Sequence, residues 1–128
     1  MDSKKLAQLC RDYADNKKAE NIAVLDVRKL SSVTDFFVIV TGTSQPHLRA
    51  IAEEISSRLR DEYDLRPARA EGASGGMWMV MDYFDVIVHV MHTEARVRYD
   101  LEGLWGDAKL LKARKPAAPK KKKTPAKK

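Results

Sequence analysis

The sequence predicts an α+β domain in which a single mixed β-sheet of about five strands is flanked by helices. Two observations support this prediction. Apolar residues recur with helical spacing in three segments, near the N-terminus, after residue 44 and after residue 93. Between these segments lie short runs rich in β-branched and aromatic residues, which are typical of strands. The predicted order is helix, two strands, helix, three strands, helix.

The first half of the chain is predicted to contain two helices and two strands. Asp2 or Ser3 caps the first helix, and Pro46 lies in the first turn of the second, after the cap sequence Thr41-Gly42-Thr43-Ser44. IAVLDV (22–27) and FFVIV (36–40) are the strands, separated by the turn-like LSSVTD. The apolar helical positions are Leu6, Leu9, Cys10, Tyr13 and Ala14 in the first helix and Leu48, Ile51, Ala52, Ile55 and Leu59 in the second.

The second half is predicted to begin with a short edge strand at 65–69, because Pro67 lacks the N–H that an inner strand needs. A flexible glycine-rich loop (72–76) and a hairpin (77–91) follow. A last helix starts near Thr93 and is expected to bury Val97, Leu101, Leu104 and Trp105.

The charges divide the chain into two parts. Residues 112–128 hold nine of the 24 Lys and Arg residues and none of the 18 acidic ones, so residues 1–111 carry 15 basic and 18 acidic side chains. We therefore expect a domain at 1–111 and a disordered Lys/Pro/Ala-rich tail at 112–128 that holds RNA weakly. The slightly acidic domain favours a basic protein partner.

Composition also restricts the class of protein. No apolar run approaches the roughly 18 residues of a membrane span, and the N-terminus lacks the apolar core of a signal peptide. The single cysteine, Cys10, fits a reducing compartment and lies in an apolar helical stripe, where a buried structural thiol is expected. We expect a cytoplasmic protein that does not bind membranes.

Three patterns could carry chemistry. Gly42-Thr43-Ser44 could hold an anion at a helix N-terminus, but its spacing matches neither a phosphate loop nor a dinucleotide fingerprint, so a helix cap is predicted. His89 and His92 are three apart on a strand and point to opposite faces, which disfavours a metal site. Asp26 and Asp35 could form a two-metal carboxylate pair, yet no third acid has matching spacing. No cofactor or metal is predicted.

The hairpin GGMWMVMDYFDVIVHVM (75–91) is the most unusual segment, because two aromatic residues stand at its tip between acids. With Tyr83 and Phe84 as the loop, Met77, Met79, Met81, Val86, Val88 and Val90 share a core face. The other face carries Trp78, Val80, Asp82, Asp85, Ile87 and His89. Either a helix covers this second face, or Trp78, Tyr83 and Phe84 form a half-exposed docking patch rimmed by Asp82 and Asp85.

Three motifs in order resemble the ribosomal silencing factor family, also called Iojap-like proteins or ribosome anti-association factors. They are AVLDVRKLSSVTDFFVIVTGTSQPHLRAIAEEI (23–55), EG-x(5)-WMVMDYFDVIVHVM (71–91) and EARVRYDLEGLW (94–105). The resemblance extends from about residue 3 to Trp105 and leaves out the Lys-rich tail. It implies a mixed sheet related to the nucleotidyltransferase fold without that fold's catalytic carboxylates.

The resemblance also implies a function. Such proteins bind the large ribosomal subunit through ribosomal protein fourteen, block joining of the small subunit, and so lower translation in starved or stationary cells. The implied contacts are Trp78, Asp82 and Tyr83, with Asp85 and His89 as neighbours. Phe84 stands where the family usually has a glycine, which leaves the turn type open. We expect a monomer or weak homodimer.

Two other functions remain open from the sequence. The first is a nucleotidyltransferase-like enzyme that uses Thr43, Ser44 and Asp26 or Asp35 with a divalent metal. The second is an RNA-binding module led by the basic tail. We expect a regulator that is not an enzyme, because no nucleophile and base fall together in the hairpin patch.

Overall fold

In the computed structural model, which describes residues 1–98 and 109–110, six strands form one sheet in the order β3-β4-β5-β2-β1-β6. Neighbouring strands are antiparallel except β2 and β5, which are parallel. The predicted mixed sheet is therefore confirmed, with one two-residue strand added to the expected five. The strands are β1 (Glu20–Asp26), β2 (Phe36–Gly42), β3 (Arg69–Ala73), β4 (Trp78–Asp82), β5 (Val86–His92) and β6 (Lys109–Leu110).

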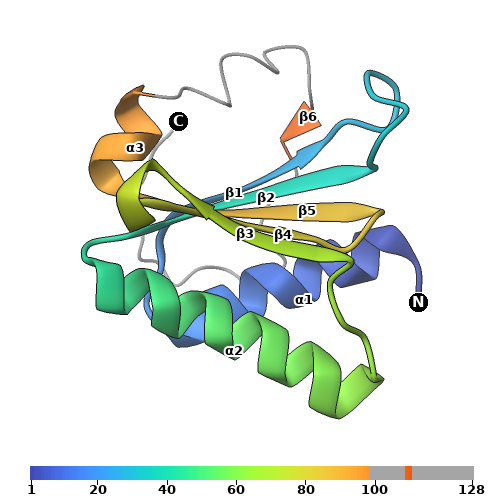
Figure 1. The fold of residues 1–128 in the computed structure, drawn as a ribbon. Helices are drawn as coiled ribbons and strands as arrows, with labels where there is room; N and C mark the ends of the chain where they lie inside the picture. Colours follow the sequence, from blue (N-terminus) through green and yellow to red (C-terminus); the bar gives the residue numbers. More distant parts are fainter. Residues whose placement is uncertain (99–108, 111–128) are drawn as a thin grey trace.

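Two long helices cover one face of the sheet, and a short helix lies on the other (Figure 1). The long helices are α1 (Ser3–Asn16) and α2 (Gln45–Tyr63), and the short one is α3 (Thr93–Arg98). Both predicted caps form: Asp2 Oδ1 accepts from the Lys5 amide at 2.7 Å, and Ser44 Oγ accepts from the His47 amide at 3.2 Å. Each cap satisfies an amide that the helix itself leaves without a partner.

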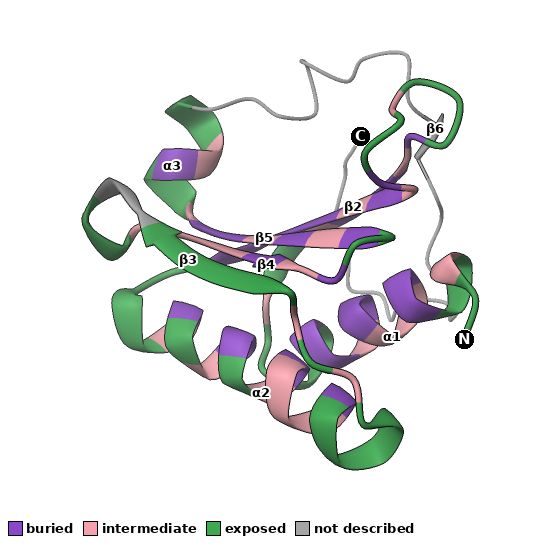
Figure 2. Ribbon diagram, turned by 45° about the vertical axis from the view of Figure 1, so that its right-hand side comes forward, coloured by how far each residue is buried: buried purple, intermediate pink, exposed green. Residues whose placement is uncertain are grey.

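The core has two parts, one on each face of the sheet. The larger packs α1 and α2 against the odd-numbered residues of β4 and the even-numbered residues of β2 and β5, and Figure 2 shows the buried helix positions turned toward the strands. The smaller joins Ala95 of α3 to Leu25, Val27, Ile39 and Met91. The alternation of strand side chains between two faces separates these clusters.

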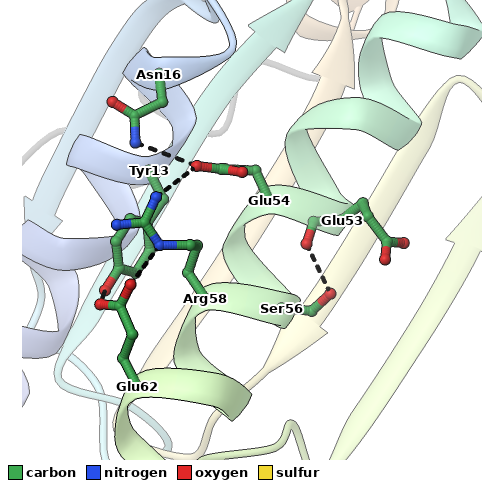
Figure 3. Close-up of polar contacts among 7 residues, drawn as sticks. All are labelled: Tyr13, Asn16, Glu53, Glu54, Ser56, Arg58 and Glu62. Atoms are coloured by element: carbon green, nitrogen blue, oxygen red, sulfur yellow. Dashed lines mark hydrogen bonds and ion pairs between the residues drawn. The ribbon is translucent and has the colours of Figure 1, made fainter.

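Polar contacts tie α1 to α2 on the outer side of the larger core (Figure 3). Tyr13 donates its hydroxyl to Glu62 at 3.0 Å, and Asn16 donates to Glu54 at 3.2 Å. Arg58 pairs with both Glu54 and Glu62, while its guanidinium lies over the Tyr13 ring at 4.9 Å from the centroid. The network fixes how the helices lie beside each other, although exposed ion pairs of this kind contribute little stability.

The edge strand lies later in the chain than predicted. β3 spans Arg69–Ala73 rather than 65–69, because the amide of Leu65 still donates to the Leu59 carbonyl at the end of α2. Pro67 falls in the connection and not in the strand. The predicted loop at 72–76 is thus divided between β3 and a short 3₁₀ turn at Ser74–Gly76.

Three expectations for buried side chains had different outcomes. Val97 of α3 was expected in the core but is 78% exposed. Met77 precedes β4 and packs with the smaller cluster, so it does not share the core face of Met79 and Met81. The expected burial of Leu101, Leu104 and Trp105 falls outside the described residues.

Cys10 is fully buried, as expected for a structural thiol, and burial raises its pKa to about 12. A thiol with such a pKa is a poor nucleophile at neutral pH. Within the described ranges, no helix combines the length and apolar character that a membrane crossing requires. The division into a domain at 1–111 and a tail at 112–128 remains a prediction, since the tail is outside the described residues.

Candidate functional site

The turn between β4 and β5 has an uncommon geometry. Tyr83 and Val86 are joined by a hydrogen bond from the Tyr83 amide at 2.9 Å, so the two loop residues are Phe84 and Asp85, one position later than predicted. The Asp85 amide donates to the Tyr83 carbonyl at 2.8 Å, which closes a γ-turn centred on Phe84. Phe84 has φ of 70°, the sign found in the rarer, strained form of that turn. Asp82 Oδ1 braces the loop by accepting from the Phe84 amide at 2.7 Å.

With Tyr83 and Phe84 as the loop, the sequence predicts Asp82 opposite Asp85, Val80 opposite Ile87 and Trp78 opposite His89, and the observed pairing is displaced from this by two residues. Asp82 lies opposite Ile87, Val80 opposite His89 and Trp78 opposite Met91. A displacement of two keeps the side chains within β4 and β5 on their predicted faces, because strand side chains alternate with a period of two.

The exposed tip holds Phe84, which is 70% exposed, and the exposed Asp85. Tyr83 was expected beside them in the half-exposed patch, but its side chain is 4% exposed and belongs to the larger core cluster. The alternation that places Met79 and Met81 toward α1 and α2 continues to Tyr83, so its ring points into the core. Its hydroxyl has no hydrogen-bond partner among the described residues, and burial raises its pKa.

Trp78 lies at the other end of β4, about 13 Å along the strand from Asp82 by the usual rise per residue. Its indole Nε1 donates to His89 Nδ1 at 3.0 Å. The His89 ring lies between Trp78 and Phe37, with centroid separations of 5.7 and 5.5 Å. Sequence reasoning did not include Phe37, although its alternation with the buried Phe36 places it on this face.

The second face therefore carries a half-exposed strip along β4 and β5 that ends at the turn. Trp78 and His89 form one end, Val80 and Ile87 the middle, and Asp82 the end beside Phe84 and Asp85. Of the six predicted site residues, five line this strip or its tip, and Tyr83 supports the tip from the core. Such a surface offers aromatic contact area and carboxylates to a partner.

Burial lowers the pKa of His89 from 6.5 to about 4, which keeps the ring neutral at physiological pH. Neutral Nδ1 is the acceptor that the Trp78 N–H needs. The His89 ring binds a proton more readily in the unfolded chain than in the folded protein, so protonation favours unfolding. The contribution of neutral His89 to the free energy of unfolding is therefore complete above pH 6.5. It is lost as pH falls toward 4.

We expect His89→Asn, which keeps an acceptor near the Trp78 N–H but does not titrate, to flatten the stability profile between pH 6.5 and 4. Chemical denaturation across that range measures the effect for both proteins. Parallel profiles for the variant and the unmodified protein would show that His89 is not the group responsible.

The residues that the sequence suggested for anion or metal binding make hydrogen bonds within the fold. The Thr43 amide donates to His47 Nδ1 at 3.0 Å, and His47 Nε2 contacts the Lys17 carbonyl at 2.7 Å, so this cap joins α2 to the end of α1. Asp26 accepts from the Arg28 guanidinium at 2.7 and 2.9 Å. His92 Nδ1 accepts from the Glu94 amide at the start of α3. Among the described residues, no three His, Cys, Asp or Glu side chains are grouped as metal binding requires.

Comparison with known proteins gives consistent matches. A family model described as "Ribosomal silencing factor during starvation" matches residues 1–128. The ribosomal silencing factor of Halalkalibacterium halodurans is 39% identical over 108 residues, covering 84% of this chain and 92% of that protein. A mouse protein named "Mitochondrial assembly of ribosomal large subunit protein 1" is 32% identical over 95 residues, or 70% of this chain and 40% of its own length.

The fold is also similar to a solved structure. A crystal structure of a Chromobacterium violaceum protein superposes with a TM-score of 0.78 at 30% identity. The superposition covers 92% of this chain and 97% of that one.

Proposed function

This chain belongs to the ribosomal silencing factor family, whose role is ribosome-associated silencing of translation, and from that premise we propose how it acts. It binds the large ribosomal subunit through ribosomal protein fourteen and blocks the small subunit from joining. Translation then falls under starvation or in stationary phase. The action is steric, so it requires affinity and position rather than turnover.

The geometry of the β4–β5 turn is the observation that carries this proposal. Phe84 is exposed although an apolar ring gains by burial, and its backbone is held at a positive φ that disfavours any residue but glycine. Strained, exposed residues of this kind concentrate where a protein contacts a ligand or partner. The strip that leads from the turn to Trp78 and His89 extends the contact area along the sheet.

The charges beside the turn favour a basic partner. Asp82 and Asp85 flank Phe84, and the backbone amide of Asp35 donates to the Asp85 carbonyl at 2.9 Å, which brings a third carboxylate-bearing residue to this end of the sheet. Carboxylates attract a basic ribosomal protein and repel the phosphates of RNA. The proposed contact is therefore with protein.

Co-sedimentation with purified subunits tests the proposal. We expect the protein to pellet with large subunits and not with small ones, and to bind isolated ribosomal protein fourteen. Equal recovery with both subunits, or with neither, would contradict it.

Deleting residues 113–128 is expected to leave large-subunit binding intact near 150 mM salt, because the proposed contact lies on the sheet. Eight of the nine basic residues after position 111 are lost in this deletion, so weak binding to bulk RNA at low salt should fall. Co-sedimentation at two salt concentrations separates these effects. Loss of large-subunit binding at 150 mM salt would place the binding energy in the tail instead.

The enzyme alternative makes a different prediction. A nucleotidyltransferase-like protein would be stabilised by nucleotide and magnesium, since a ligand that binds the folded state raises the melting temperature. With Asp26 held by Arg28 and the Thr43 amide held by His47, we expect no such shift with ATP, CTP or GTP. A clear increase in melting temperature would support catalysis.

A further inference from the structure

Two loops leave the sheet at the same end. β1 and β4 run antiparallel to β2 and β5, so the loop after β1 (27–35) and the turn after β4 (83–85) emerge side by side. The amides of Asp35 and Phe36 donate to the Asp85 carbonyl at 2.9 and 3.1 Å, which fastens the base of the first loop to the second. Figure 1 shows this end on the right, opposite α3.

The loop after β1 holds apolar side chains in solvent. Val33 is 75% exposed and Leu30 is 46% exposed. The loop is nevertheless ordered by its own bonds: the Val27 amide donates to the Asp35 carbonyl at 2.9 Å, and the Val33 amide donates to Ser31 Oγ at 3.0 Å. These hydrogen bonds fix the loop in a conformation in which Leu30 and Val33 are exposed.

Exposed apolar residues concentrate at this end of the sheet. Six large apolar side chains are strongly exposed among the described residues, and three of them, Leu30, Val33 and Phe84, lie on these two loops. Single exposed apolar residues need no explanation, but a group of them rimmed by polar residues marks an interaction surface. The sequence predicts a turn for LSSVTD (30–35), and the two apolar residues within it, Leu30 and Val33, are the signal for this surface.

The charge of this surface is negative. Arg28 is neutralised by Asp26 through two hydrogen bonds, and its guanidinium lies 5.1 Å from the Phe36 ring centroid. Among the described residues at this end, Lys29 and Arg69, which lies opposite Asp82 in the sheet, are outnumbered by the carboxylates of Asp35, Asp82 and Asp85. This balance is unfavourable for a phosphate backbone and favourable for a basic protein surface.

We propose that Leu30 and Val33 join Phe84 in one docking surface, the loop edge, which also includes Asp35, Asp82 and Asp85. Its occupant is the basic ribosomal protein to which the strip on β4 and β5 binds, so the inference rests on the proposed function and extends the contact onto a second loop. Apolar side chains provide contact area, and the three carboxylates set the charge that the partner must complement.

Serine substitutions test this surface. Leu30→Ser and Val33→Ser together should weaken binding to purified large subunits at least tenfold, with an unchanged melting temperature because both side chains are exposed. Val97→Ser is the matched control: its side chain is 78% exposed, close to the 75% of Val33, but it lies on α3 at the opposite end of the sheet. The control should bind as the unmodified protein does.

Val33→Lys distinguishes the kind of occupant. Against a basic protein the added charge weakens binding, whereas against ribosomal RNA it strengthens binding, most clearly at low salt. Unmodified protein that fails to bind large subunits would overturn the proposed function and this inference together. Normal binding by the serine double variant, while Asp85→Lys binds poorly, would overturn the part of the loop edge formed by Leu30 and Val33 and leave the proposed function standing, as would stronger binding by Val33→Lys.

Discussion

Replacing Tyr83 with alanine is expected to lower the free energy of unfolding by about 3–5 kcal/mol, the usual cost of removing a large aromatic ring from a core. The Tyr83 side chain is 4% exposed and packs in the cluster formed by α1, α2 and the sheet. Its backbone also closes the turn that carries Phe84, through bonds to Val86 and Asp85. Denaturant unfolding measures this loss, and a variant as stable as the unmodified protein would contradict the buried position.

Tyr83→Phe is the matched control. The hydroxyl that it removes is buried without a hydrogen-bond partner among the described residues, and such a group costs free energy. We expect stability to be unchanged or to rise by up to about 1 kcal/mol, and ribosome binding to be unaffected. Weaker binding by this variant would show that the hydroxyl itself reaches the partner.

Replacing Phe84 with glycine is expected to separate binding from stability. Loss of an aromatic anchor typically costs about 2 kcal/mol of binding, or roughly thirtyfold in dissociation constant. The fold should be unharmed, because the ring is 70% exposed and the positive φ of 70° suits glycine better than phenylalanine. The gain in folding stability from relieving this φ is limited, since glycine also adds conformational entropy to the unfolded chain.

Isothermal titration with large subunits and a thermal melt of the same sample check both halves of this prediction. The resemblance implies that related proteins usually carry glycine at this position, so under the proposed contact the ring would add area that those relatives lack. Thirtyfold weaker binding with an equal or higher melting temperature is the expected pair of results. Unchanged affinity would mean that Phe84 is not part of the contact.

Much of the fold follows from local signals in the sequence. Helical spacing and capping residues located α1 and α2, and short apolar runs located β1, β2, β4 and β5, of which β4 is rich in methionine rather than in β-branched residues. The edge strand was predicted too early in the chain because the sequence does not show where α2 ends. The Leu65 amide still donates to the Leu59 carbonyl at that end. Val97 was misplaced because α3 packs on the sheet through Ala95, and a residue two positions further along a helix points away from that face.

The site was predicted less completely, for two physical reasons. Tyr83 was placed at the tip because a two-residue loop was centred one position too early, although the alternation of Met79 and Met81 already pointed it inward. A γ-turn around a phenylalanine is not a pattern that turn statistics favour. The contribution of the loop after β1 depends on a long-range bond between Asp35 and Asp85, which no local pattern reveals.

The central claim, that this protein prevents the subunits from joining, is tested most directly by a sucrose-gradient profile of large and small subunits mixed with the protein. The unmodified protein and Tyr83→Phe should both shift the profile from joined ribosomes to separate subunits. Asp85→Lys, which reverses a charge on the exposed tip, should leave the subunits joined. Joined ribosomes at saturating unmodified protein, with the protein sedimenting among them, would contradict the account.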